Sequence, residues 1–88
     1  MAKPPKDAKD PAGAKAPGKP GGAEGFADPE AGEAWVRNPN GKGHGWQDAN
    51  GDVWVPTGHG GSAHAGPHWD VQKHDGTHVN VYPGGTTR

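Results

Sequence analysis

Two histidines stand four residues apart in the stretch GGSAHAGPHWDVQ, which covers residues 60–72, and a carboxylate follows the second. His64 lies in a glycine-rich loop. His68 and Asp70 are two residues apart, the spacing that places side chains on one face of a strand. An imidazole takes up and releases protons near neutral pH, and a carboxylate can hold an imidazole in one orientation. We therefore predict that His64, His68 and Asp70 form an acid–base catalytic group.

A β-hairpin over residues 68–83, HWDVQKHDGTHVNVYP, must position these side chains. A three-residue loop ending at Gly76, in the left-handed conformation, gathers the valines and Trp69 on one apolar face. The predicted cross-strand pairs are Val71 with Val79 and Trp69 with Val81. The opposite face then carries the polar residues His68, Asp70, Gln72, His78, Asn80 and Tyr82. His74 lies at the predicted loop tip, where we expect alanine to be tolerated.

Ordinary solvation accounts for any polar strand face, but lysine, glutamate and threonine, the usual solvent-side residues, are absent from this one. Amide, imidazole and phenol groups can instead position a phosphate and stack on a base. Two cations upstream can meet the phosphate charge. The predicted substrate-binding residues are Gln72, His78, Asn80, Tyr82, Lys42 and Arg37.

The upstream segment GWQDANGDVWVP, residues 45–56, contains Asn50-Gly51, the strongest two-residue hairpin signal. A two-residue turn places Trp46 opposite Val55, and this is the register we prefer. A three-residue loop ending at Gly51 would instead place Trp46 opposite Trp54.

The residues available for a core are few and mostly suited to strands. The 88 residues include four Trp, six Val, one Phe and one Tyr, but no Leu, Ile or Cys. Since β-branched and aromatic side chains fit a pleated surface, we predict a mainly β, small α+β fold. It consists of an antiparallel sheet of two hairpins, preceded by a short N-terminal helical turn at residues 28–29.

Residues 1–25 differ in composition from the rest, with five Pro, five Gly and five Lys. Such a segment buries too little surface to offset its conformational entropy. We therefore predict a disordered linker over residues 1–25 and a small domain over residues 26–88. In that domain four Lys and Arg face seven Asp and Glu, a net charge of −3 that argues against a broadly basic nucleic-acid-binding face.

Several cofactor and enzyme motifs are incomplete. The glycine-rich loop lacks a P-loop lysine, and GGSAH does not match the G-x-S-x-G of a serine hydrolase. Asp48-x-Asn50-x-Asp52 is similar to a calcium loop but lacks its later glycine and glutamate. We expect no cofactor; the alternative is a zinc ion held by histidines, since His64 and His68, like His74 and His78, have a spacing found among zinc ligands.

Three segments in order, GKGHGWQDANGDVWVPTG, GGSAHAGPHWDVQ and HVNVYPGG, resemble a known family. They are similar to the C-terminal toxin domains of bacterial polymorphic toxin systems, the type 37 group, which form the tips of Rhs-type effectors. The resemblance spans roughly residues 26–85. Position by position it points to His64, His68, Asp70 and Gln72, and it leaves His59 and Ser62 without an assigned role.

The resemblance implies a nuclease toxin that is secreted as part of a larger effector, acts in the target-cell cytoplasm and is neutralised by a cognate immunity protein. No apolar run is long enough to span a membrane, so we expect no membrane anchoring. With the histidine chemistry above, we predict a metal-independent ribonuclease. The alternatives are a histidine–metal DNase and a non-enzymatic binding module.

Overall fold

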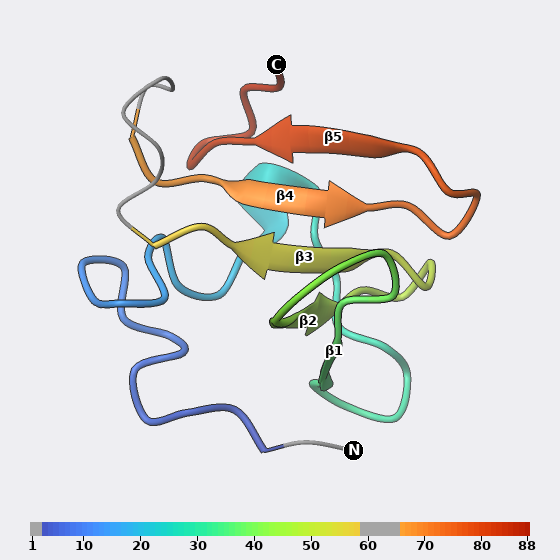
Figure 1. The fold of residues 1–88 in the computed structure, drawn as a ribbon, viewed down its shortest axis with the longest axis horizontal. Coiled ribbons are helices and arrows are strands. Elements are labelled where there is room, and N and C mark those ends of the chain that lie inside the picture. The colour runs from blue at the N-terminus through green and yellow to red at the C-terminus, as the bar shows by residue number, and fades with distance from the viewer. Residues whose placement is uncertain (1–2, 59–65) are drawn as a thin grey trace.

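The computed structural model describes residues 3–58 and 66–88, and within these it contains one antiparallel sheet of five strands (Figure 1). The strands lie in chain order across the sheet: β1 (Trp35–Arg37), β2 (His44–Gln47), β3 (Val53–Pro56), β4 (Trp69–Gln72) and β5 (His78–Val81). The predicted mainly β, antiparallel fold is confirmed. The two hairpins formed by β2 to β5 were predicted from the sequence, and the structure adds β1, which pairs with β2.

One face of the sheet carries the core. A row of large side chains crosses all five strands through neighbouring pairs: Trp35–Trp46, Trp46–Trp54, Trp54–Val71 and Val71–Val79. The Trp35 and Trp46 rings meet edge to face with centroids 5.0 Å apart, an arrangement that aromatic pairs prefer. Trp46 and Val71 are the largest fully buried side chains. A chain without Leu or Ile therefore builds its core from indoles and valines.

The hairpin of β4 and β5 has the predicted register. Val71 pairs with Val79 and Trp69 with Val81. Gly76 has a φ of +91°, the left-handed conformation that the three-residue loop requires. Trp69 is 2% exposed, so the apolar face of this hairpin is buried as expected. A slip of one residue would expose that face, and the pattern therefore fixes the register.

The hairpin of β2 and β3 differs from the preferred prediction. Trp46 pairs with Trp54 rather than with Val55, and the loop has three residues and ends at Gly51, whose φ is +86°. The preferred two-residue turn was wrong, because it would have placed Trp46 and Trp54 on opposite faces of the sheet. Both indoles belong to the core row.

The Asp48 carboxylate stabilises the longer loop. It accepts hydrogen bonds from the backbone N–H of Asn50 at 2.9 Å and of Asp52 at 3.0 Å, and from the Trp54 indole Nε1–H at 2.9 Å. A buried carboxylate with three donors is well satisfied. Asp48, the first residue of the segment that resembles a calcium loop, therefore stabilises the hairpin loop through these hydrogen bonds.

The helical element of the described residues is one 3-10 turn, η1 (Gly22–Glu24), which precedes the predicted start at residues 28–29. The Glu24 carboxylate accepts hydrogen bonds from the N–H of Gly21 at 2.8 Å and of Gly84 at 2.7 Å. The turn is therefore tied to the chain beyond β5, a contact that no local signal indicates. Over residues 3–58 and 66–88 no helix has the length and apolar character needed to cross a membrane.

Part of the segment predicted to be a linker packs against the sheet. The Trp69 indole N–H donates to the carbonyl of Gly18 at 2.8 Å, and the Gly58 N–H donates to the carbonyl of Ala16 at 2.7 Å. The Lys19 ammonium lies 5.4 Å from the centroid of the Trp46 ring. Composition could not predict the two hydrogen bonds, because the backbone carbonyl of any residue can accept one. The division of the chain at residue 25 stays a prediction.

Candidate functional site

The loops of the two hairpins lie at the same end of the sheet and have the same construction. In each, the N–H of the residue before the loop donates to the carbonyl of the residue after it. These bonds join Asp48 to Asp52 at 2.9 Å and Lys73 to Thr77 at 2.8 Å. Each loop ends in a left-handed glycine, Gly51 or Gly76. A Cβ atom on Gly51 would lie 3.9 Å from the Cβ of His74, so the two loops are neighbours in space.

Asp52 joins these two loops. It follows the first loop directly, and its side chain is 5% exposed. Its Oδ1 accepts the backbone N–H of His74 at 2.8 Å and lies 2.7 Å from Nδ1 of the His74 ring. The His74 side chain is 65% exposed. A buried carboxylate thus holds an exposed imidazole, as carboxylates do in acid–base sites.

The charges around this contact favour an ionised carboxylate. Burial by itself raises the pKa of Asp52, but hydrogen bonds from the backbone and ring of His74 and the charge of Lys73 outweigh it. The pKa of Asp52 therefore lies below its ordinary value. Lys73 Nζ is 3.6 Å from Oδ2 of Asp52. Since an ionised carboxylate only accepts hydrogen bonds, the hydrogen of a neutral His74 ring belongs on Nδ1.

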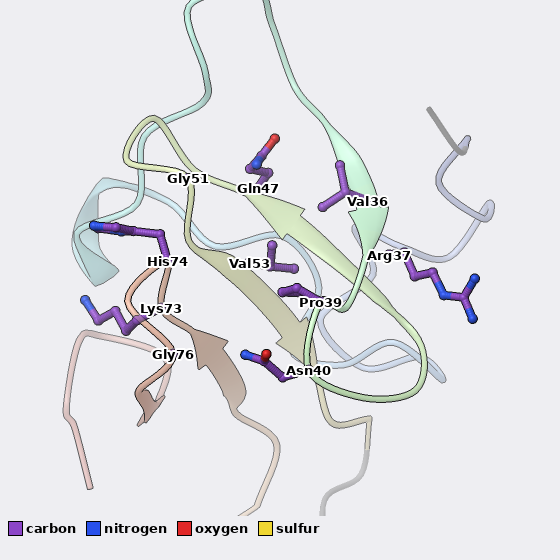
Figure 2. A pocket seen from close by; sticks show the side chains of 10 residues that line it. All are labelled: Val36, Arg37, Pro39, Asn40, Gln47, Gly51, Val53, Lys73, His74 and Gly76. Carbon is purple, nitrogen blue, oxygen red and sulfur yellow. The ribbon is translucent and has the colours of Figure 1, made fainter.

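A hollow lies beside His74 on the sheet (Figure 2), with a volume of about 350 Å³. Small-ligand pockets run from roughly 300 to 1,000 Å³, so the hollow is near the lower end of that range. In Figure 2, Lys73 and His74 lie on one side and Arg37 lies at the opposite edge. The polar side chains of the lining are three that can carry positive charge and two amides: Arg37, Lys73, His74, Asn40 and Gln47. This lining suits an anion that also presents hydrogen-bonding edges.

His68 lies at the opposite end of β4. Its ring stacks on Tyr82 with centroids 4.8 Å apart, and its Nδ1 lies 3.0 Å from the carbonyl oxygen of Gly66. His68 is 4% exposed, although it was expected on a solvent-facing surface. Roughly 16 Å of chain separates it from Lys73, at about 3.3 Å per strand residue. Tyr82 is buried as well, and its ring contacts His68 where the sequence analysis expected it to stack on a base.

A polar strip connects the two ends of β4. The Gln72 amide donates to Asp70 Oδ1 at 2.9 Å, and its oxygen accepts the Asn40 amide N–H at 3.0 Å, which links the strip to the hollow. Asp70 pairs with Asn80, and Gln72 pairs with His78. These strand residues therefore share one face of the sheet. His78 is exposed, and the others of the strip are half-buried.

The two cations predicted to bind substrate, Arg37 and Lys42, lie in different places. Arg37 lines the hollow. Lys42 is exposed in the β1–β2 connection, where its carbonyl accepts the Asn38 amide N–H at 3.2 Å, and it is not part of the lining. The predicted catalytic residue His64 lies outside the described residues, as do His59 and Ser62.

Asp52 and Lys73 had no predicted role in the site, and His74 was expected to tolerate alanine. The signal for Asp52 was the register of the first hairpin. With a three-residue loop in the first hairpin, both hairpin loops have the same construction. Asp52, which follows the first loop, then lies beside His74, which begins the second. Because a two-residue turn was preferred, the contact between Asp52 and His74 was not predicted. Asn40 offered no local signal, since only the path of the β1–β2 connection brings it to Gln72.

Metal ligation has no candidate in the part of the chain that the structure describes. No three His, Asp or Glu side chains of residues 3–58 and 66–88 are grouped so that they could hold an ion.

The family profile described as Bacterial toxin 37 matches residues 14–85 of the chain. No curated protein and no solved structure gives a significant match. The matched range covers the whole sheet, both hairpin loops and all residues of the hollow. It also begins well before residue 26, and so includes the residues that contact Trp69 and Gly58 from the N-terminal side.

Proposed function

This chain belongs to the bacterial toxin 37 family, and from this premise we propose that it is the toxic domain of a larger secreted effector and acts as a ribonuclease without a metal ion. Its site of action is the cytoplasm of the target cell. A cognate immunity protein is the partner that protects the producing cell. Its substrate is RNA, bound at the hollow between the two hairpin loops and the β1–β2 connection.

The observation that supports this proposal is the lining of the hollow. Although the domain as a whole carries more acidic than basic residues, three groups that can donate hydrogen bonds to a phosphate border this one hollow: Arg37, Lys73 and His74. Asn40 and Gln47 add amide donors and acceptors, which can read the edge of an unpaired base. A volume of about 350 Å³ suits a segment of about one nucleotide rather than a duplex.

Cleavage of RNA needs no external nucleophile. A general base removes the proton of a ribose 2′-hydroxyl, and the 2′-oxygen attacks the adjacent phosphorus. The bond from phosphorus to the 5′-oxygen breaks, and a general acid protonates that oxygen as it leaves. The products are a 2′,3′-cyclic phosphate and a 5′-hydroxyl. Arg37 and Lys73 can neutralise the charge that develops on the phosphoryl oxygens.

The test is to incubate the purified domain with total RNA, purified tRNA and plasmid DNA, each with and without EDTA. We expect cleavage of RNA in both conditions, with 2′,3′-cyclic phosphate ends. A synthetic oligonucleotide with one 2′-deoxy position should resist cleavage at that position alone. Cleavage of DNA that EDTA abolishes would establish the histidine–metal DNase instead, and killing of cells without any cleavage would establish a binding module.

Two matched variants connect the activity to the hollow. Arg37→Gln removes a charge from its edge, whereas Lys6→Gln removes the same charge from an exposed position outside it. We expect the first to raise KM and the second to leave KM unchanged. Equal effects would show that only general charge attraction is involved. The groups named from the sequence are tested in the same assay by His64→Ala, His68→Ala and Asp70→Asn.

A further inference from the structure

We propose that His74 and Asp52 are the acid–base pair of this domain, with His74 acting on the substrate and Asp52 positioning it. This inference rests on the proposed ribonuclease function and assigns its proton transfer to the loop end of β4. The sequence by itself gave the opposite expectation for His74. The pair joins elements that lie 22 residues apart in the chain.

The geometry fixes the imidazole at two points. Asp52 Oδ1 accepts the backbone N–H of His74 at 2.8 Å and lies 2.7 Å from its ring Nδ1. One oxygen thus holds both the chain and the ring, so the ring has little freedom to turn. In the neutral ring Nδ1 carries the hydrogen, and Nε2 presents its lone pair away from the carboxylate. With 65% of the side chain exposed, Nε2 is accessible to a phosphodiester.

The neighbouring charges suit proton transfer to a phosphodiester. Lys73 Nζ lies 3.6 Å from Asp52 Oδ2, and Arg37 stands at the far edge of the hollow. Asp75, in the same loop as His74, is bound by the N–H and hydroxyl of Thr77 at 3.0 and 2.6 Å. On the facing loop, Asp48 is occupied by its three donors. Lys73 and Arg37 border the hollow on opposite sides, whereas Asp75 and Asp48 are each hydrogen-bonded within their own hairpin.

The proposed step is balanced within the substrate and this pair. His74 Nε2 takes the proton of the 2′-hydroxyl as the 2′-oxygen bonds to phosphorus. Asp52 stays ionised and stabilises the imidazolium. The 5′-oxygen leaves with the proton of the imidazolium, delivered directly or through a water molecule that the imidazolium reprotonates, and the pair returns to its starting state. His68 is about 16 Å along the chain from this end, so one phosphodiester cannot contact both histidines at once.

The pair also holds the two loops together, and the test must separate this role from catalysis. His74→Ala keeps the backbone N–H that Asp52 accepts, so the loops should stay joined. We expect His74→Ala to lower kcat/KM for RNA by roughly 10²–10⁴-fold, the usual contribution of a general acid or base. Its circular dichroism spectrum and unfolding midpoint should remain close to those of the parent. Asn50→Ala, an exposed position on the facing loop, is the matched control and should retain full activity.

Two further readouts would not respond to a merely structural role. Added imidazole should restore part of the activity of His74→Ala, since it can enter the space that the ring leaves. The pH profile of the parent should show a limb that His74→Ala lacks, because the variant has no imidazole to take up the proton. Asp52→Asn should lower kcat more than it raises KM, because it disturbs the orientation of the ring rather than the binding of phosphate.

The outcomes separate this inference from the proposed function. If the parent cleaves no RNA, the ribonuclease proposal fails first. If the parent cleaves RNA, and folded His74→Ala cleaves it equally fast, the assignment of the pair is overturned. Loss of activity in folded His68→Ala with full activity in His74→Ala would return catalysis to the opposite end of β4.

Discussion

The two ends of β4 present a histidine in opposite ways. His68 is 4% exposed, stacks on Tyr82 and lies within hydrogen-bond distance of a backbone carbonyl. His74 is 65% exposed, and a buried carboxylate holds its ring. The first arrangement secures packing, and the second leaves a ring nitrogen available while fixing its direction. The proposed pair therefore differs from the predicted one in two ways: its histidine is accessible, and its carboxylate comes from the other hairpin.

The largest expected effect comes from the core that both ends share. Trp69→Ala removes a side chain that is 2% exposed and whose indole donates to the Gly18 carbonyl. We expect a loss of about 3–5 kcal/mol in the free energy of unfolding. Small domains have only roughly 5–15 kcal/mol to lose, so the variant should unfold at a much lower urea concentration than the parent. Urea unfolding followed by tryptophan fluorescence measures this. A loss of less than about 1 kcal/mol would contradict the burial of Trp69.

A smaller effect should distinguish the two histidines directly. His68→Ala removes a buried ring and its stacking on Tyr82, for which we expect a loss of about 1–3 kcal/mol in the free energy of unfolding. His74→Ala removes an exposed ring and should cost less than about 0.5 kcal/mol. Urea unfolding of the two variants under the same conditions tests this order. Equal losses would show that the His68 end is no more packed than the loop end.

The smallest expected effect is an acid dependence of stability at the loop end. The pKa of Asp52 lies below its ordinary value because hydrogen bonds from His74 and the charge of Lys73 outweigh the effect of burial. A carboxyl group with a lowered pKa in the folded state stabilises the protein above its unfolded pKa, near 3.9. That contribution is lost as the pH falls through the folded-state value. Unfolding midpoints between about pH 6 and 2 should fall with acid in the parent and fall less in Asp52→Asn.

Glu33 and Asp75 also have lowered pKa values and contribute to the acid slope in the same direction. The hydrogen bonds that cause these shifts come first from Lys19 for Glu33 and from Thr77 for Asp75. Asp52→Asn leaves both in place, so it should reduce the slope without removing it. An unchanged slope in Asp52→Asn would show that the hydrogen bonds of Asp52 do not contribute to folding stability.

The predictability of the two hairpins differed for a physical reason. In the second, alternation of valine and polar residues allowed one register only, and that register is observed. In the first, Asn50-Gly51 favoured a short turn on local grounds. The observed loop is one residue longer because Trp46 and Trp54 must join the same core row, and because Asp48 can then accept three hydrogen bonds. Local turn preference was weaker than the burial of two indoles.

The site, like the hairpins, was predictable only in part. Alternation along β4 and β5 correctly placed Asp70, Gln72, His78 and Asn80 on one face. It could not show that His68 is buried at the end of that face, since burial depends on what covers a strand end. Nor could it join Asp52 to His74 across 22 residues of chain.

The sequence by itself determined the strand-rich composition of this protein, the register of its second hairpin and its membership in a toxin family. Periodicity and composition are properties of the chain, and they limit which faces can be buried. The tertiary structure decided which histidine is packed and which is accessible, which cations border the hollow, and which carboxylate supports an imidazole. These depend on the meeting of two loops and the β1–β2 connection, because short-range polar contacts form only between groups that folding has already brought together.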